Sequence, residues 1–324
     1  MDPGTHHLSF WEKMMKPFNQ IFDHRGTVLI IALLVISTLT GLTIDFSEET
    51  GIELNLAGFS RDNAMAWETA RSGVHMALYL LDRDEERSMD SLLEDWARLG
   101  PETLPAVLGE DASLEGRITD ECGKLNINNL FNSEGQIDEE MMDRFKRLFS
   151  ILGMEEDLLE PLFDWLDKDD TPRVNGAESA FYRDLLPSYT CSNGAFLTVG
   201  QIALVKGLKD SGLSRYVTVY TDGKVNLNTA PKEVLESLSP KLDSSMAEAI
   251  IEYRKDKDFL NADELSQVPG MDQSVYSGVS QSVTVKSAAF SIEVEGKYRE
   301  TLTKISAVAL RIEGRPQLVY WKVH

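Results

Sequence analysis

An uncharged apolar run near the start of the chain constrains everything after it. From Thr27 to Ile44 no residue carries a charge, and as an α-helix this run is roughly 27 Å long. The hydrocarbon core of a bilayer is ~30 Å thick, so the run can span a membrane. A secretory signal has a shorter apolar stretch that ends in small residues, whereas acidic residues follow this one. We therefore predict a membrane-spanning helix over residues 27–46.

Basic residues flank this helix on one side only. Residues 1–26 contain Lys13, Lys16 and Arg25, and the next Lys or Arg after the helix is Arg61. Flanks rich in Lys and Arg stay in the cytoplasm. We expect residues 1–26 on the cytoplasmic side and the chain from Asp45 onward outside.

The composition indicates a folded, acidic body. Hydrophobic residues make up 42% of the chain and charged residues 26%, which is typical of a globular protein. The net charge of −21 argues against nucleic-acid binding, because that affinity comes mainly from Lys and Arg. An acidic surface suits divalent cations or basic partners instead.

The chain has two cysteines, Cys122 and Cys191. In an exported, oxidising compartment they can form a disulfide. The alternative is two buried small thiols, and the sequence leaves both open.

Hydrophobic periodicity orders the body as helix, strands, helices and strands. An amphipathic helix is expected over 61–82, after a break near Gly51 or Gly58, and two strands within 114–130. Side chains that can cap helices occur at Asp138, Thr198 and Asn261. Helices are predicted over 199–205, 232–238, 244–255 and 262–268, and strands over 283–285, 289–298, 303–313 and 317–323. Since the late strands need an earlier sheet to complete, we predict an α+β fold in which a helix-on-antiparallel-sheet domain is interrupted by a helical insertion.

One short motif occurs twice. GKLNIN at 123–128 returns as GKVNLN at 223–228. Both fit a glycine turn, a short strand and Asn side chains that bind local backbone. We interpret them as two similar strand-to-helix transitions, because a duplication needs more matching length than six residues.

Five carboxylates lie close together in FDWLDKDDTPRVNGAESAFY, residues 163–182. Calcium takes six to eight oxygen ligands on flexible backbone, and this loop can supply several, although its spacing is not that of an EF-hand. The alternative is a solvated acidic helix end, which costs up to ~1 kcal/mol unless compensated. We predict a calcium site formed by Asp167, Asp169, Asp170 and Glu178, and place Asp164 on the helix surface.

Two other function classes have weaker support. Residues 223–238 and 247–271 resemble helix-hairpin-helix repeats of membrane-anchored DNA receptors. The turn between them, at 239–244, contains Pro240 and Asp243 and lacks glycines. It therefore has few free backbone amides for a phosphate, and the charge of Asp243 repels one. A membrane-anchored DNA-binding protein is kept as the alternative function. We predict no enzyme, because the chain has five histidines, three of them before the helix, and no catalytic motif.

Several ordered motifs resemble the K-type minor pseudopilins of type II secretion systems (general secretion pathway protein K). They extend over nearly the whole chain: RGTVLIIALLV at 25–35, LLEDWA at 92–97, ITDECGKLNINNL at 118–130, DWLDKDDTPRVNGAE at 164–178, NGAFLTVGQIALVKG at 193–207 and GKVNLNTAP at 223–231.

The resemblance implies a division of the chain and a set of partners. A prepilin peptidase would remove residues 1–26 by cutting after Gly26, leaving Thr27 as a methylated N-terminus. The segments would then be a membrane and spine helix (27–46), a pilin-like domain (47–130 and 282–324) and an inserted α-helical domain (131–281). It also implies calcium binding, I- and J-type minor pseudopilin partners, an inner-membrane secretion platform, and a single-pass inner-membrane protein with a periplasmic body.

The resemblance also gives Ile31 a meaning. Pilin-like helices carry a glutamate five residues after the cleavage site, whose charge is neutralised by the N-terminal amine of the subunit above. Counted from Thr27 this position is Ile31, and no acid occurs before Asp45. A subunit without this group can be the first one, so we predict a position at the tip of the pseudopilus, from which assembly begins.

Overall fold

The computed structural model describes residues 24–84, 88–99 and 111–324. The chain divides into two compact units, Met1–Asp62 and Asn63–His324. Most of the predicted leader, residues 1–23, lies outside the described residues. Gly26 and Thr27 lie in the first turns of helix α2.

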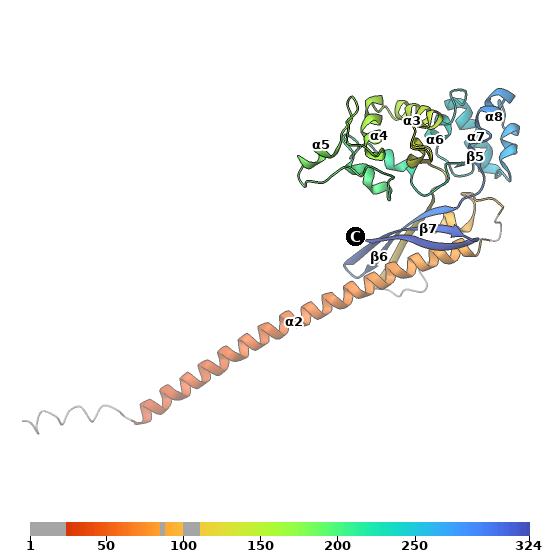
Figure 1. Ribbon diagram of the computed structural model, residues 1–324. Helices are drawn as coiled ribbons and strands as arrows, with labels where there is room; N and C mark the ends of the chain where they lie inside the picture. Colours follow the sequence, from red (N-terminus) through yellow and green to blue (C-terminus); the bar gives the residue numbers. More distant parts are fainter. Residues whose placement is uncertain (1–23, 85–87, 100–110) are drawn as a thin grey trace, which may run out of the picture. The chain divides into compact units, whose positions relative to one another are not determined.

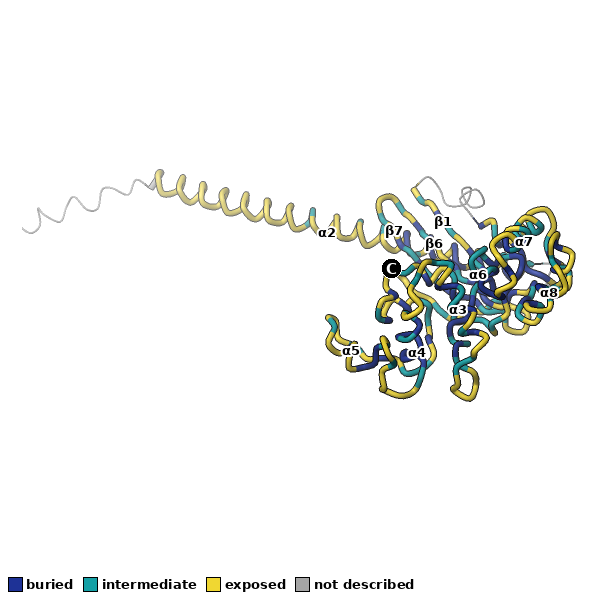
Figure 2. Tube along the Cα trace, turned by 90° about the horizontal axis from the view of Figure 1, so that it is seen from above, coloured by how far each residue is buried: buried dark blue, intermediate teal, exposed yellow. Residues whose placement is uncertain are grey.

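Helix α2 runs without interruption over His24–Asp82. The predicted break near Gly51 or Gly58 is wrong, because glycine costs a helix only ~1 kcal/mol and the segment has no proline to remove a hydrogen bond. Within the described residues this is the one helix long and apolar enough to cross a membrane. Figure 2 shows its first part almost wholly exposed, including Val28, Leu29 and Ile31.

The last turns of α2 pack on a four-stranded antiparallel sheet of order β1-β6-β7-β8 (Figure 1). The helix and the sheet share one core, to which α2 contributes Ala70 and Ala77 and the sheet contributes Phe290 and Ile292. The predicted alternation of the late strands and the α+β class are confirmed. The strands are β1 (Ala112–Asp120), β6 (Ala289–Tyr298), β7 (Thr301–Ile312) and β8 (Arg315–Val323).

A glycine sets how closely α2 approaches the sheet. A Cβ at Gly296 would lie 2.3 Å from Ala70 N and 2.6 Å from Ala66 O, both backbone atoms that cannot move alone. Gly296→Ala is therefore expected to lower the free energy of unfolding by about 3 kcal/mol through overpacking, measured by urea denaturation. Gly200→Ala is the matched control, because its nearest neighbour is 3.8 Å away. Equal losses in the two variants would contradict this role of Gly296.

The insertion between β1 and β6 has its own core, which includes Phe145, Leu162 and Leu235. Two of the predicted helix caps are confirmed, since Asp138 accepts from Met141 N and Asn261 accepts from Glu264 N. At the third, Thr198, Gln201 Oε1 accepts from the backbone N–H of Thr198.

The helices of the insertion are short. The α-helices are α3 (Glu139–Ile151), α4 (Glu160–Leu166), α5 (Ser179–Arg183), α6 (Lys232–Ser237), α7 (Ser244–Asp256) and α8 (Gln273–Val279). The 3-10 helices are η2 (Ile127–Leu130), η3 (Glu156–Leu159), η4 (Val199–Leu204), η5 (Leu213–Arg215) and η6 (Ala262–Gln267).

The insertion consists of two equivalent halves. In the first, β2 (Leu125–Asn126) pairs in parallel with β3 (Val217–Thr218); in the second, β4 (Val225–Asn226) pairs in parallel with β5 (Val283–Thr284). One Asn side chain in each half binds a distant backbone N–H and C=O, Asn128 those of Phe196 and Asn228 those of Phe259.

The sequences around these contacts also match. FLTVGQIALVKGL at 196–208 corresponds to FLNADELSQVPGM at 259–271, and Gly207 and Gly270 at matching positions both have positive φ. The likeness therefore extends well beyond the six-residue motif. We conclude that the halves are an internal duplication and not merely two similar transitions.

The predicted bounds of the insertion, 131–281, are too narrow. β2 and β5 pair inside the insertion and not with the main sheet, so the insertion starts directly after β1 and ends directly before β6. The two strands predicted within 114–130 both exist but belong to different sheets. Cys122 and Cys191 are both buried and both free, so the second of the two alternatives for the cysteines holds.

Candidate metal centre

The acidic loop begins where α4 ends. Asp164 lies on the last turn of α4 with none of its surface exposed, between the core residues Phe163 and Trp165. Asp167 follows as the C-terminal cap, three positions later and so on the same helical face. The prediction that Asp164 is a surface residue is wrong. Its neighbours in α4 are buried apolar residues, so this part of the helix lies in the core.

Asp164, Asp167 and Glu178 form the site. One carboxylate oxygen of each lies within 4.8 Å of the others, so a single ion can contact all three. Asp169 and Asp170 are exposed and lie outside this group. Asp169 accepts from Thr171 N, and Asp170 accepts from Asn193 Nδ2. Of the four predicted ligands, the structure therefore places Asp167 and Glu178 in the group. The third member is Asp164, which was predicted to lie on the helix surface.

Close packing brings the two ends of the loop together. Arg173 N donates to Asp164 Oδ2 at 3.2 Å, and a Cβ at Gly176 would lie 2.0 Å from the same oxygen. Only glycine fits there, which lets the backbone fold back and carry Glu178 to Asp164. The Cys191 thiol donates to Asp164 O at 3.4 Å from a second loop.

The site holds more negative charge than its surroundings balance. Arg173 is the neighbouring cation, with Nε 3.5 Å from Asp164 Oδ1 and Nη2 3.7 Å from Asp167 Oδ2. Both oxygens of Glu178 are buried, and among the described residues the Cys191 thiol, a weak donor, is the one group that hydrogen-bonds to this carboxylate. Burial, and then the charges of Asp164 and Asp167, raise the pKa of Glu178 to about 7. Burial is also the main cause that raises the pKa values of Asp164 and Asp167.

Asn193 holds the exposed part of the acidic loop. Asn193 has φ +46°, its Nδ2 donates to Asp169 O, and its Oδ1 is buried without a partner. Carboxylate and amide oxygens on a loop are the donors that calcium prefers. The donor set therefore fits a divalent cation. Sequence reasoning left Asp164 out of the site, although the i, i+3 spacing of Asp164 and Asp167 was an available signal.

The metal-free protein is expected to gain stability as pH falls from about 7 toward 4.5. The folded-state pKa of Glu178, about 7, lies above its ordinary value of 4.5, so the native state binds the extra proton in this window. Glu178→Gln should flatten the dependence of melting temperature on pH in EDTA, whereas the exposed Asp170→Asn should not. Parallel curves for wild type and Glu178→Gln would contradict this account.

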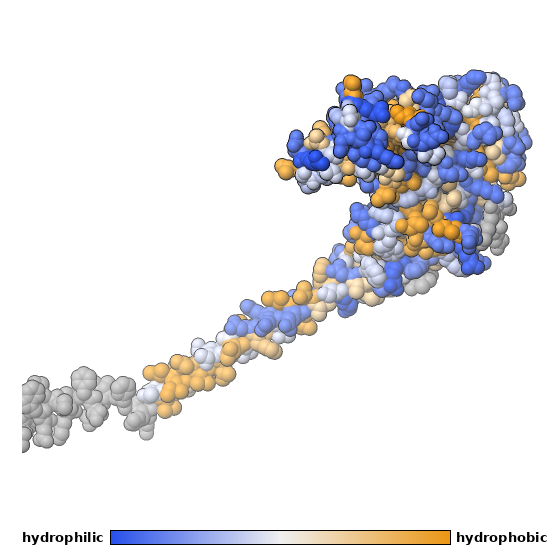
Figure 3. Space-filling view, in the orientation of Figure 1, coloured by the Kyte–Doolittle hydropathy of each residue, from blue (hydrophilic) through white to orange (hydrophobic). Residues whose placement is uncertain are grey.

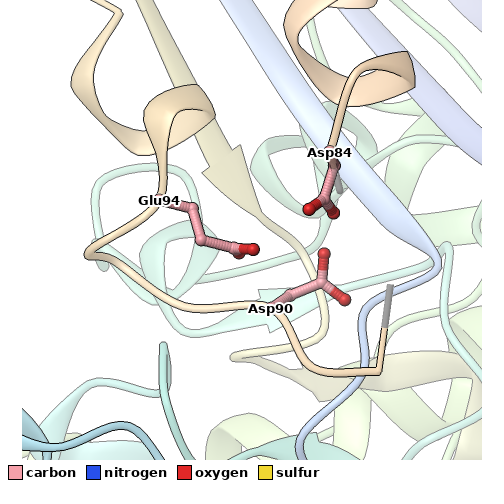
Figure 4. Close-up of side chains that lie close together, drawn as sticks. All are labelled: Asp84, Asp90 and Glu94. Carbon is pink, nitrogen blue, oxygen red and sulfur yellow. The ribbon is translucent and has the colours of Figure 1, made fainter. Parts of the chain in front are cut away.

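A second acidic group, Asp84, Asp90 and Glu94, lies at the end of α2 (Figure 4). In this group, other residues of the protein already balance the negative charge and donate hydrogen bonds to the carboxylates. Arg311 pairs with Asp84 and Asp90, and Glu94 accepts from Ser91 N and Trp96 Nε1, each at 2.8 Å. This group is a structural cluster held by ion pairs and hydrogen bonds, whereas Glu178 has only the weak Cys191 thiol as a donor.

In the turn considered for DNA binding, residues 239–244, a side chain of the turn itself binds the backbone amide of the following helix. Asp243 Oδ1 accepts from Met246 N at 2.9 Å and caps α7. A backbone amide that a phosphate would need is thus already bound to a carboxylate.

Comparison with known proteins agrees with this architecture. Two sequence families, both described as type II secretion system (T2SS) protein K, match residues 123–222 and 225–286, which together make up half of the chain. The chain belongs to the type II secretion system protein K family. The boundary between the two matches falls between the two duplicated halves of the insertion. Proteins of this family are minor pseudopilins of type II secretion, and the chain is one of them.

Individual relatives show the extent of the similarity. Type II secretion system protein K of Pseudomonas aeruginosa is 29% identical over 258 residues, which cover 75% of this chain and 76% of that protein. The Aeromonas hydrophila protein K is 24% identical, with 88% and 92% covered. A chain in the crystal structure of the GspK-GspI-GspJ complex of enterotoxigenic Escherichia coli has the same fold, with a TM-score of 0.65 at 16% identity and 83% and 99% covered.

Proposed function

We propose that this minor pseudopilin occupies the tip of the pseudopilus and begins its assembly. The observation that carries the proposal is the first part of α2, which has no charged side chain from Thr27 to Ile44. A glutamate at position 31 would need the amine of a subunit above it to offset its burial. Because Ile31 makes no such demand, the subunit can stand at the end of the fibre with others docked beneath.

The partners in this proposal are the I- and J-type minor pseudopilins. The structural neighbour was solved as a GspK-GspI-GspJ complex, and the shared fold supports an equivalent assembly for this chain. The large insertion supports a terminal position, because it adds bulk to the pilin-like domain that a subunit stacked above would have to avoid.

Processing and location follow the same proposal. A prepilin peptidase cuts between Gly26 and Thr27, and the new N-terminus is methylated. The helix then stays in the inner membrane, with the body in the periplasm, until the secretion platform moves it into the fibre. Calcium bound by Asp164, Asp167 and Glu178 stabilises the insertion, which is supported by the close grouping of these three buried or half-buried carboxylates.

Ile31→Glu tests the position in the fibre. Immunogold labelling of pseudopili is expected to show wild-type protein at one end only, and Ile31→Glu should not improve assembly. Ile31→Leu is the matched control that keeps the site apolar. Incorporation of Ile31→Glu along the shaft would overturn the tip assignment.

A further inference from the structure

The outer strand β8 is an open edge of the main sheet. In the part of the chain that the structure describes, it pairs with β7 on one side and with no strand on the other. His324 N donates to Lys304 O at 2.9 Å, and bonding alternates along an antiparallel pair. The backbone N–H and C=O groups of Trp321 and Val323 therefore point outward. At the opposite edge, β1 lies against the segment around η1 (Asp95–Arg98), where a Cβ at Gly116 would be 3.0 Å from Leu99.

Strand β8 carries several apolar side chains that do not build the core. Seven of its nine residues are exposed, and the core between α2 and the sheet contains residues of β1, β6 and β7 but none of β8 among the described residues. Trp321 is 37% and Val323 45% exposed. Figure 3 shows apolar side chains gathered over the sheet on the face seen there. A long, unpaired edge strand that exposes large apolar side chains pairs readily with another strand.

The charge of β8 indicates which strand would pair with it. Residues 315–324 contain Arg315, Lys322 and His324 and no acid, in a chain of net charge −21. Within the described ranges, neither Arg315 nor Lys322 forms an ion pair. Two copies joined edge to edge would bring like charges together, which costs free energy. A strand that carries both apolar and acidic residues would complement the exposed apolar side chains and the positive charge of β8.

We propose that β8 is a docking edge for an extended, acidic strand of a neighbouring pseudopilin, which pairs with Trp321 and Val323 and extends the sheet. The proposal rests on the proposed function, because the neighbour is an I- or J-type subunit. Backbone hydrogen bonds supply affinity and the alternate side chains supply specificity. Lys322 supplies the charge that selects an acidic strand.

The experiment uses the full chain in detergent, co-expressed with I- and J-type pseudopilins, and measures their co-purification and affinity. Val323→Pro removes an outward N–H and keeps the inner ladder, a substitution that edge strands tolerate. Lys322→Glu reverses the charge. Both variants should weaken binding about tenfold or more, equivalent to ~1.4 kcal/mol. Leu186→Glu, at a residue 98% exposed on the insertion, is the matched control. Unchanged melting temperatures show that each variant is folded.

Each result has a distinct meaning. Loss of binding in Val323→Pro and Lys322→Glu, with Leu186→Glu like wild type, supports the docking edge. Equal binding by all variants overturns the docking edge and leaves the proposed function standing. No binding of the partners by the wild type overturns both. A homodimer that depends on β8, seen by light scattering of the chain alone, would show a second copy as the occupant and overturn the proposal.

Discussion

Millimolar calcium is expected to raise the melting temperature of the full chain in detergent by several degrees. A ligand that binds only the native state adds ~2.7 kcal/mol at one hundred times its Kd, which is about 5–10 °C for a domain of this size. The physical reason is the group of three carboxylates within 4.8 Å of one another, whose burial and mutual repulsion raise the pKa of Glu178 to about 7. Intrinsic fluorescence can follow unfolding, because Trp165 stacks on Phe196 at 5.9 Å behind the site.

Asp164→Asn should abolish most of this rise, since it removes a buried charge from the centre of the site. Asp170→Asn is the matched control, because Asp170 belongs to the same loop but lies outside the group. It should keep the calcium response. A full response in Asp164→Asn, or an equal response of the wild type to magnesium, would contradict a calcium site built on these residues.

Asn226→Ala is expected to cost about 3 kcal/mol of unfolding free energy, because it leaves several buried polar groups without a partner. Asn226 is fully buried. Its Nδ2 faces Asp90 O, Asp120 Oδ2 and Ser287 Oγ at 2.8 to 3.0 Å, and its Oδ1 accepts from Asn228 N. These contacts join the duplicated insertion to the ends of β1 and β6.

The duplication provides the control for this prediction. Asn126 occupies the matching position in the first half, where it accepts from Asn128 N and donates to Thr221 O. It contacts no residue of the main sheet through these bonds, so Asn126→Ala should cost about 1 kcal/mol. Limited proteolysis should show release of the insertion in Asn226→Ala only. Equal losses measured by urea denaturation would mean that the junction has no special role.

Local patterns in the sequence were sufficient to place most elements. The predicted strand 289–298 is the observed β6 (Ala289–Tyr298), and the predicted helix 244–255 differs from α7 (Ser244–Asp256) by one residue. Alternation and helical periodicity reflect which face of an element is buried, and caps such as Asp138 act on neighbouring backbone. Such signals lie within a few residues and can be read without the fold.

Contacts between segments that are distant along the chain could not be predicted from these local patterns. The equivalence of the two halves depends on Asn128 binding Phe196 and Asn228 binding Phe259, with separations of 68 and 31 residues. Different separations hide a duplication from a search for a constant period. The assignment of β2 and β5 to the insertion likewise follows from strand pairing that only the fold shows.

The sequence by itself determined the apolar helix, the interrupted sheet, the acidic loop and the absence of a carboxylate at Ile31, because these are properties of composition and spacing. Only the tertiary structure decided that Asp164 faces Asp167 and Glu178 while Asp169 and Asp170 face outward. The physical reason is that burial depends on what packs against a residue. The loop around Gly176 and the segment that contains Cys191 cover Asp164 from positions that are distant along the chain.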